Sequence, residues 1–327
     1  MLSEVEHCDE TTWGVHLLEL AERGLHPDYT VADGGLALRA GQKAAWGSVP
    51  CHGDVFHGER ELGQLASYLS HRAAGCTAAV AILERKMERL KKSGRDGRTL
   101  SGRLNSARRA RVRAVALADD VRLLSDWMRQ DILSLAGPDL NSRRGLFDFV
   151  IEELAKREPL CPHRIEPVCR LLRRQRDDLL AFAGVLDERF AQLANQMHLP
   201  PRDMHALCQL QGLDRNGPAY WQQAGRLIAR LGEKFHVAQA AVIAIMHETP
   251  RASSVVENLN SRLRPYFFLR RQLGDDYLDL LRFFLNHHRF RRSRRPERAD
   301  HSPAELLTGQ NHPHWLELLG GQPFRRN

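Results

Sequence analysis

The sequence predicts a mainly α-helical protein with a small α/β portion. Three observations lead to this fold class. Residues 59–246 carry apolar side chains at helical spacing almost throughout, residues 11–57 alternate between helix and strand patterns, and 43% apolar with 27% charged residues is the composition of a globular chain. Because the chain has 327 residues, we expect two domains or one domain with a large insertion.

The N-terminal portion predicts two short strands, each preceded by a helix. The expected helices are residues 11–24 and 36–46, and the expected strands are residues 29–32 and 51–57. A sheet normally needs at least three strands and a covered face to be stable by itself. We therefore expect these two strands to belong to a larger sheet.

Residues 59–246 predict helices packed on helices. Apolar residues from Val80 to Leu90 follow a 3-4-3 spacing. Residues 164–198 carry apolar residues at near-heptad intervals, interrupted by Gln175 and Arg176, which predicts a long helical hairpin. Glycine and proline predict breaks at residues 93–97, 137–138, 159–162, 200–201 and 217–218.

The C-terminal region, from residue 253 onward, predicts three further helices and a basic run. The first helix ends near Arg264, the second covers residues 275–288, and a short third helix begins near Ser302. The arginine-rich run, residues 290–298, lies between the second and the third of these helices.

The balance of charge favours a polyanionic partner. The formal net charge is +8 and the sequence pI is near 9.5. Each phosphate that a basic side chain neutralises releases condensed counterions, and arginine, the dominant basic residue here, binds phosphate bidentately. DNA or RNA is therefore the expected class of partner.

The sequence also indicates a compartment. The longest apolar stretch, residues 237–246, is shorter than the roughly 20 residues that span a bilayer, and the acidic N-terminus is unlike a signal peptide. Six cysteines occur without a Cys-x-x-Cys pair, which favours reduced thiols over a zinc site. We expect a cytoplasmic, nucleoid-associated protein with no membrane partner.

Asp33 is the first candidate for chemistry. It follows directly after the predicted strand 29–32 and precedes two glycines. A carboxylate at a strand end beside a flexible backbone suits a metal ligand, because phosphate or a metal ion can approach it closely. The alternative, which the sequence alone favours, is a turn aspartate that caps the next helix.

Asp54 and His57 form an Asp-x-x-His pair at the end of the second predicted strand. In a strand this spacing puts the two side chains on opposite faces, whereas a bend can bring them together. The alternative, again favoured by the sequence alone, is that His57 only begins the following helix.

Glu257 lies on the helix predicted for residues 254–264, with Asn260 and Arg264 on about the same face. This polar face is a candidate site. The alternative is a capping box formed by Ser254 and Glu257, in which the glutamate only satisfies a backbone amide. The two interpretations stay open.

The arginine-rich run is the candidate nucleic-acid contact, because it carries little opposing charge and follows two histidines. A solvated tail is the alternative. The arginines of residues 103–113 are a second candidate, although there a solvated helix face is the favoured interpretation. The candidate DNA-binding residues are Arg264, Arg289, Arg291, Arg292, Arg294 and Arg295.

Five segments, taken in order, carry a resemblance to a known family. They are residues 32–35 (ADGG), 50–57 (PCHGDVFH), 253–264 (SSVVENLNSRLR), 284–290 (FLNHHRF) and 302–309 (SPAELLTG). Together they resemble bacterial insertion-sequence transposases of the Asp-Asp-Glu class. The resemblance covers nearly the whole chain, and its specificity lies in the order of the motifs, since each motif by itself is modest.

The resemblance implies a partial RNase H-like core interrupted by a long helical insertion. The partial core would occupy residues 1–58, the all-helical insertion residues 59–248, the return to the core with the glutamate-bearing helix residues 249–290, and a basic C-terminal tail residues 291–327. Asp33 and Glu257 would then be catalytic carboxylates. Asp54 and His57 would be the Cys/Asp-x-x-His signature of Mutator-like and hAT-like relatives, with Asn260 beside the glutamate.

The resemblance also implies the chemistry. In this family carboxylates hold two Mg²⁺ (or Mn²⁺) ions for DNA strand cleavage and transfer at transposon ends in double-stranded DNA. The implied metal ligands here are Asp33 and Glu257. The ten residues before the first predicted helix leave no room for the strand that bears the first catalytic aspartate. We therefore expect an N-terminally truncated, catalytically impaired copy, and homo-oligomerisation is left open.

Two other functions remain as alternatives. One is a non-catalytic helical DNA-binding or interaction protein that uses the helical residues and the basic tail. The other is an unrelated metal-dependent nuclease, which would require a further carboxylate near Asp33.

Overall fold

The computed structural model describes residues 9–249, 251, 259, 261, 263–266, 274–293 and 296–322. These residues are mostly helical and contain one small parallel sheet of two strands, which confirms the coarse fold class expected from the sequence. The chain divides into two compact units. One is Trp13–Ser254, and the other combines Met1–Thr12 with Val255–Asn327.

The sheet is formed by two strands that flank a helix. After α1 (Glu10–Glu22), strand β1 (Thr30–Ala32) is followed by α2 (Leu36–Ala45) and strand β2 (Cys51–Gly53). The strands are parallel, and Ala32 pairs with Gly53. Both expected helices and both expected strands are therefore present.

The second strand is shorter than the sequence pattern indicated. It ends at Gly53, and helix α3 (Val55–Lys92) begins two residues later. The Asp54 carboxylate accepts a hydrogen bond from the Phe56 amide at 2.9 Å, which is the N-cap arrangement that starts a helix. The extended segment expected to reach His57 is therefore wrong, because its apolar residues form the first turn of α3.

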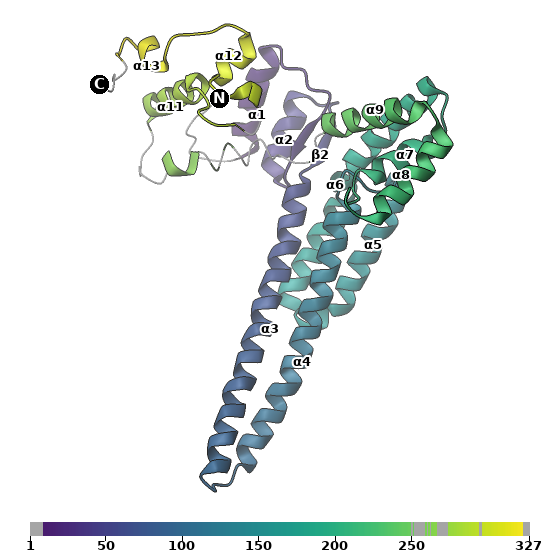
Figure 1. Ribbon diagram of the computed structural model, residues 1–327. Coiled ribbons are helices and arrows are strands. Elements are labelled where there is room, and N and C mark those ends of the chain that lie inside the picture. The colour runs from purple at the N-terminus through teal and green to yellow at the C-terminus, as the bar shows by residue number, and fades with distance from the viewer. Residues whose placement is uncertain are drawn as a thin grey trace, which may run out of the picture. The chain divides into compact units, whose positions relative to one another are not determined.

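Two long helices form an antiparallel hairpin. Helix α3 and helix α4 (Arg98–Trp127) lie side by side and are joined by the glycine-containing turn expected at residues 93–97 (Figure 1). The hairpin expected at residues 164–198 is wrong. Helix α6 (Pro162–Met197) runs through that region without interruption, because Gln175 is buried by neighbouring elements and does not break the helix.

Shorter helices complete this unit. Helices α6, α7 (Pro201–Leu210) and α8 (Pro218–Leu231) each begin with a proline, whose fixed backbone angle suits the first helical position. This confirms the breaks expected at residues 159–162, 200–201 and 217–218. The remaining elements are η1 (Met128–Ile132, a π-helix), α5 (Leu140–Arg157), η2 (Glu158–Leu160) and α9 (Lys234–Glu248).

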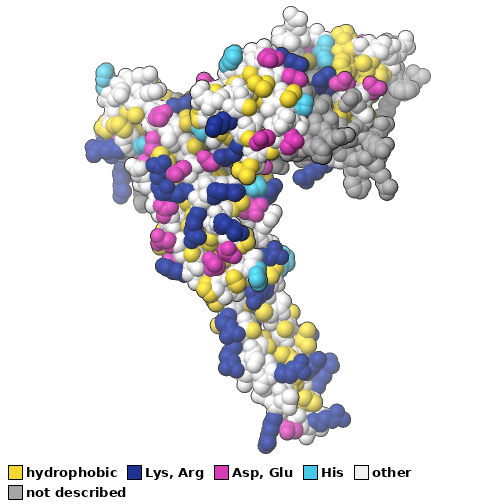
Figure 2. Space-filling model, turned by 180° about the vertical axis from the view of Figure 1, so that it is seen from behind, with side chains coloured by type: hydrophobic (Ala, Val, Ile, Leu, Met, Phe, Trp, Pro, Cys, Tyr) yellow, Lys and Arg dark blue, Asp and Glu magenta, His cyan; other side chains and the backbone are white. Residues whose placement is uncertain are grey.

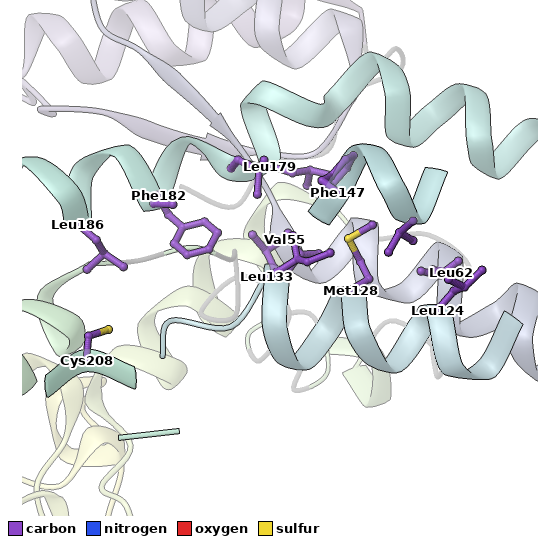
Figure 3. Close-up of a cluster of buried hydrophobic side chains, with 14 of the residues drawn as sticks. Val55, Leu62, Leu124, Met128, Leu133, Phe147, Leu179, Phe182, Leu186 and Cys208 are labelled. Atoms are coloured by element: carbon purple, nitrogen blue, oxygen red, sulfur yellow. The ribbon is translucent and has the colours of Figure 1, made fainter. Parts of the chain in front are cut away.

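The apolar core of this unit lies where the helices converge beside the sheet. Val55 at the start of α3 lies close to Leu179 of α6 and to Leu133 after the π-helix, and Phe147 and Phe182 complete this part of the core (Figure 3). All five side chains are at most 2% exposed. The start of α3 is therefore embedded in the helical part of the unit.

A buried arginine fastens the loop after the π-helix to α5. The Arg143 guanidinium donates hydrogen bonds to the carbonyl oxygens of Pro138 (2.6 Å), Ser134 (2.6 Å) and Leu135 (3.1 Å), and also to that of Ile132. Burial lowers the pKa of Arg143 to about 10, so the side chain stays charged at neutral pH. Its positive charge is balanced by carbonyl dipoles.

The second unit contains α11 (Asp275–His287), η3 (Pro296–Arg298), α12 (Pro303–Thr308) and α13 (Trp315–Leu318). Residues 259, 261 and 263–266 are also helical. The helices expected at residues 275–288 and near Ser302 are confirmed.

Among the helices that the structure describes, none combines the length and the apolar character needed to cross a bilayer.

Replacing Arg143 by methionine is expected to destabilise the protein strongly. The substitution keeps most of the side-chain volume but leaves the carbonyl oxygens of residues 132, 134, 135 and 138 without their donor. We expect a loss of at least about 3 kcal/mol in the free energy of unfolding, measured by urea denaturation. Arg122→Met is the matched control, because Arg122 lies exposed on α4, and it should change stability by less than about 0.5 kcal/mol. Equal effects of the two substitutions would contradict the structural role of Arg143.

Candidate functional site

The carboxyl ends of the two parallel strands meet at one edge of the sheet. Because Ala32 pairs with Gly53, the next residues along the chain, Asp33 and Asp54, follow neighbouring positions at this edge. The Asp54 amide extends the pairing by donating to the Ala32 carbonyl at 2.9 Å. We call Asp33, Asp54 and the residues that surround them the strand-end site.

Asp33 is exposed and shapes the turn between β1 and α2. One carboxylate oxygen accepts a hydrogen bond from the Gly35 amide at 3.0 Å. A Cβ atom at Gly35 would lie only 2.9 Å from that oxygen, so a glycine is needed for the carboxylate to adopt this position. The geometry fits the turn interpretation of Asp33 and also leaves the carboxylate at the surface.

Asp54 and His57 lie at the start of α3. Asp54 is 4% exposed and caps the helix, while the His57 ring nitrogen Nδ1 lies 3.0 Å from a guanidinium nitrogen of Arg60. The capping bond explains Asp54 without any ligand. Asp54, and not His57, directly follows the strand position that pairs with Ala32.

Helix α6 covers the strand-end site. A Cβ atom at Gly53 would lie 3.0 Å from the backbone of Asp178 and Leu179, and one at Gly34 would lie 1.9 Å from the side-chain amide of Gln175. Glycine at position 53 therefore allows the backbone of α6 to approach the sheet closely, whereas the neighbour of Gly34 is the flexible end of the Gln175 side chain. Sequence reasoning missed these α6 residues, although the polar interruption of the apolar stripe at Gln175 was the available signal.

Arg39 of α2 links the strand end to α6. Its Nε donates to the carbonyl oxygen of Asp33 at 3.1 Å, and its Nη1 forms an ion pair with the Asp178 carboxylate at 2.5 Å. The backbone that carries Asp33 is thus held from both sides, by its own helix and by α6.

Aromatic stacking supports the sheet on the same elements. The His52 ring of β2 stacks on Tyr29 with centroids 4.6 Å apart. Burial lowers the pKa of His52, against the opposing effect of Asp178, so His52 is neutral at pH 7. Burial likewise raises the pKa of Tyr29. The pair therefore contributes packing and no charge at neutral pH.

After the helices α3 to α9, the chain returns to the strand-end site. The Arg251 carbonyl accepts a hydrogen bond from the Val55 amide at 3.0 Å. Its guanidinium binds Glu59 of α3 at 3.2 Å and also the carbonyl of Leu133. Residues 55 and 251 are therefore adjacent in space, and Arg251 stands six positions before Glu257 in the sequence (257 − 251).

The structure describes one of the two expected metal ligands. Within the described residues, no three or more histidine, cysteine, aspartate or glutamate side chains gather in a way that would hold a metal ion. Glu257 and Asn260 lie outside the described residues. Asp33 is thus the expected metal ligand whose position the structure gives.

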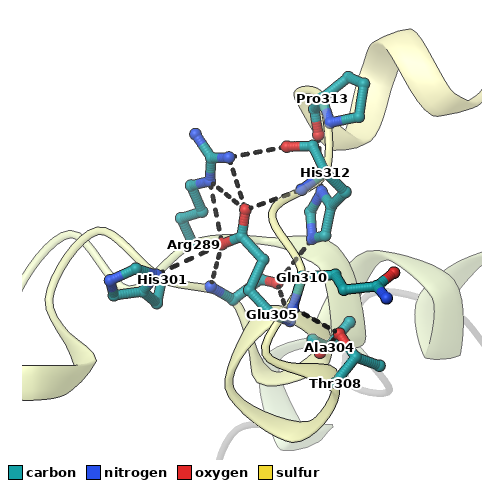
Figure 4. Close-up of polar contacts among 9 residues, drawn as sticks. Arg289, His301, Ala304, Glu305, Thr308, Gln310, His312 and Pro313 are labelled. Carbon is teal, nitrogen blue, oxygen red and sulfur yellow. Dashed lines mark hydrogen bonds and ion pairs between the residues drawn. The ribbon is translucent and has the colours of Figure 1, made fainter.

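The expected DNA-binding arginines differ in their surroundings. Arg264, Arg291 and Arg292 are exposed, and Arg294 and Arg295 lie outside the described residues. Arg289 instead binds the buried Glu305 carboxylate at 2.6 Å and the His312 carbonyl at 2.7 Å (Figure 4). The structure thus gives Arg289 a structural role that the sequence did not indicate.

Glu305 is the centre of this polar cluster. It closes a capping box with Ser302 at the start of α12, and its carboxylate also accepts from the His312 amide at 3.2 Å. Hydrogen bonding from Arg289, aided by these backbone amides, lowers the pKa of Glu305 to about 2. The Ser-Pro-Ala-Glu segment is therefore a folding motif of the second unit.

Comparisons with known proteins do not assign a family. No protein-family model matches the chain, and no curated protein or solved structure matches it either.

Gly53→Ala is expected to destabilise the protein by about 1–3 kcal/mol. The added methyl group would press on the rigid backbone of α6 at Asp178 and Leu179. Gly63→Ala is the control, because a Cβ atom there meets nothing within 4 Å on the exposed side of α3, and it should stabilise the helix by about 0.5–1 kcal/mol. Thermal unfolding measures both. Gly53→Ala without loss of stability would contradict the close packing of α6 on β2.

Glu305 is expected to make the C-terminal unit sensitive to acid. A carboxylate whose pKa is lowered on folding contributes stability above its ordinary pKa of 4.5, and this contribution is lost as the pH falls toward about 2. Glu305→Gln should therefore speed amide exchange at Ser302 and His312 at neutral pH. The difference from the unmodified protein should shrink below about pH 4.5. Glu297→Gln, in an exposed position, should have no such effect, and a pH-independent difference for Glu305→Gln would contradict the assignment.

Proposed function

We propose that this chain is a transposase polypeptide of the Asp-Asp-Glu class with a partial RNase H-like core. It would act on double-stranded DNA at the ends of a mobile element. The observation that carries the proposal is the strand-end site. Asp33 and Asp54 each directly follow one of two neighbouring parallel strands. A long helical segment begins directly after Asp54, and the chain comes back to the same place at Arg251.

Asp33 and Glu257 would be the metal ligands. Carboxylate oxygens are the ligands that Mg²⁺ and Mn²⁺ prefer, and the exposure of Asp33 fits such a role. The bound ions would supply Lewis-acid chemistry for phosphoryl transfer. Asp54 would act differently, because its carboxylate is buried and engaged in capping α3.

The residues around Asp33 would position it. Arg39 holds the Asp33 carbonyl, and Gln175 fills the space above Gly34, so the turn that carries the carboxylate has contacts on several sides. A ligand held in place before metal binding loses less conformational entropy when the metal binds. The helical residues 59–248 would thus contribute to the site through α6. Arg264, Arg291 and Arg292, which are exposed, would contact the DNA backbone.

The test is Mn²⁺ binding to the protein in the presence of duplex DNA, followed by electron paramagnetic resonance. We expect Asp33→Asn and Glu257→Gln each to weaken Mn²⁺ binding by about tenfold or more, because each removes a charged ligand. Any Mg²⁺-dependent nicking of labelled duplex should be lost in the same two variants. Unchanged Mn²⁺ affinity in both would contradict the proposal.

Asp54→Asn is the matched control at the same edge of the sheet. Asparagine also caps helices, so we expect a change in stability within about 1 kcal/mol and little change in Mn²⁺ affinity. A loss of Mn²⁺ binding as large as that of Asp33→Asn would mean that Asp54, and not only Asp33, is a ligand.

A non-catalytic helical DNA-binding protein is the second candidate. One observation favours it: Asp33 and Asp54 each have a structural role, in a turn and in a helix cap, that requires no metal. This candidate predicts that Asp33→Asn and Glu257→Gln leave metal binding and DNA binding unchanged.

A further inference from the structure

The distal half of the α3–α4 hairpin forms an arm whose tip has no role in the strand-end site. We define the arm tip as residues 81–113, which are the end of α3, the turn and the start of α4 (Figure 1). Leu104 is buried between the two helices, with Leu83, Met87 and Leu90 half-buried in the same seam. The seam is narrow, so most side chains of the tip face solvent.

The arm tip accounts for the whole net positive charge of the chain. Residues 81–113 contain 12 lysines and arginines against 3 acidic residues, a net charge of +9 (12 − 3). The whole chain has a net charge of +8, so all remaining residues sum to −1 (8 − 9). Like charges on so narrow a structure repel one another, so this segment is less stable than a neutral hairpin would be.

These charges are presented to solvent. The basic side chains of the tip are exposed, except for Arg111, which is half-buried. Of the three acidic side chains, Glu84 is paired with Arg108 at 2.7 Å, and Asp96 accepts from the Arg98 backbone amide. Figure 2 shows lysine and arginine side chains along the arm on the face that it draws.

The start of α4 carries positive charges and no negative ones. Residues 98–118 contain six arginines and no acidic residue. Between these arginines stand the small exposed residues Ser101, Gly102, Asn105 and Ser106, over which an extended polyanion can approach the helix closely. Within residues 81–113 the exposed large apolar side chains are Ile82 and Val112, at the two ends of the segment furthest from the turn. The surface therefore suits a polyanion and not an apolar partner.

A hollow of about 590 Å³ lies at the tip between the two helices. Lys91, Arg95, Arg98 and Arg108 contribute to its wall, together with the hydroxyl of Ser101 and the amide of Asn105. Glu84, which is paired with Arg108, and Glu88 also line it, so the basic groups outnumber the acidic ones by four to two. Guanidinium groups, a hydroxyl and an amide are the groups that proteins use to hold phosphate oxygens.

We propose that the arm tip binds the phosphate backbone of duplex DNA, at a place separate from the strand-end site. The tip contains 12 residues of α3 (81–92) and 16 residues of α4 (98–113), which gives it a length of roughly 20 Å. Duplex DNA presents one negative charge per about 1.7 Å of its axis, so roughly a dozen phosphates lie along that length. The charge of the tip matches a duplex, and the contacts would be independent of base sequence.

This inference extends the proposed function by naming a surface that holds the DNA, and its test is independent of the metal site. The binding of fluorescently labelled duplex DNA is measured in EDTA, from about 50 to about 200 mM salt. The tip variant carries Lys91→Gln, Arg95→Gln and Arg98→Gln. The control variant carries Arg202→Gln, Arg215→Gln and Arg226→Gln, which are exposed residues elsewhere in the same unit and remove the same charge.

We expect the tip variant to bind at least about tenfold more weakly, and the slope of log affinity against log salt to become shallower by about 2–3, since each lost phosphate contact removes about 0.9. The control variant should bind like the unmodified protein. Equal DNA affinities and salt slopes of the two variants would overturn the proposal. The proposal would also be overturned if, in a parallel measurement with single-stranded RNA, the tip variant lost affinity for the RNA but kept its affinity for duplex DNA. Asp33→Asn should bind DNA normally here, so failure of this inference differs from failure of the proposed function.

A footprint on the unmodified protein guards against a misfolded variant. Duplex DNA should protect Lys86, Lys91 and Lys92 from acetylation, while Lys156, exposed on α5, should stay reactive. Protection of Lys156 alone would overturn the proposal.

Discussion

The close packing of α6 on the end of β2 is the contact on which the rest of the larger unit depends. Gly53 lets the backbone of Asp178 and Leu179 come so near that even a methyl group would be crowded, and Leu179 then packs on Val55 in the core. A two-stranded sheet is not stable by itself. Here one of its strands is supported by a 36-residue helix whose other contacts lie among α3, α5, α7 and α9.

This contact also helps to position the residues of the strand-end site. Because α6 and Arg39 hold the turn after β1, the Asp33 carboxylate has a defined place at the surface, and Arg251 brings the returning chain to the same edge. The proposed chemistry would use this edge of the larger unit. The concentrated positive charge lies elsewhere, at the arm tip.

Local signals in the sequence predicted the elements well. Prolines at the first positions of α6, α7 and α8, the glycines at residues 93–97 and the helix start near Ser302 act within a few residues, so they are readable without the fold. The hairpin expected at residues 164–198 failed for the opposite reason. A polar residue within an apolar stripe resembles a break, but Gln175 is buried against Gly34, a contact across 141 positions (175 − 34).

The helical class, the breaks between helices, the positive charge of residues 81–113 and the position of Asp33 after a strand can all be read from the sequence, because spacing, capping and composition are local properties. The folded chain was needed to show that Asp54 and Asp33 share one edge, that α6 covers it, that the chain returns there at Arg251, and that Arg289 binds Glu305. These pairings join residues far apart in the chain, and they arise from shape and charge complementarity that no local pattern records.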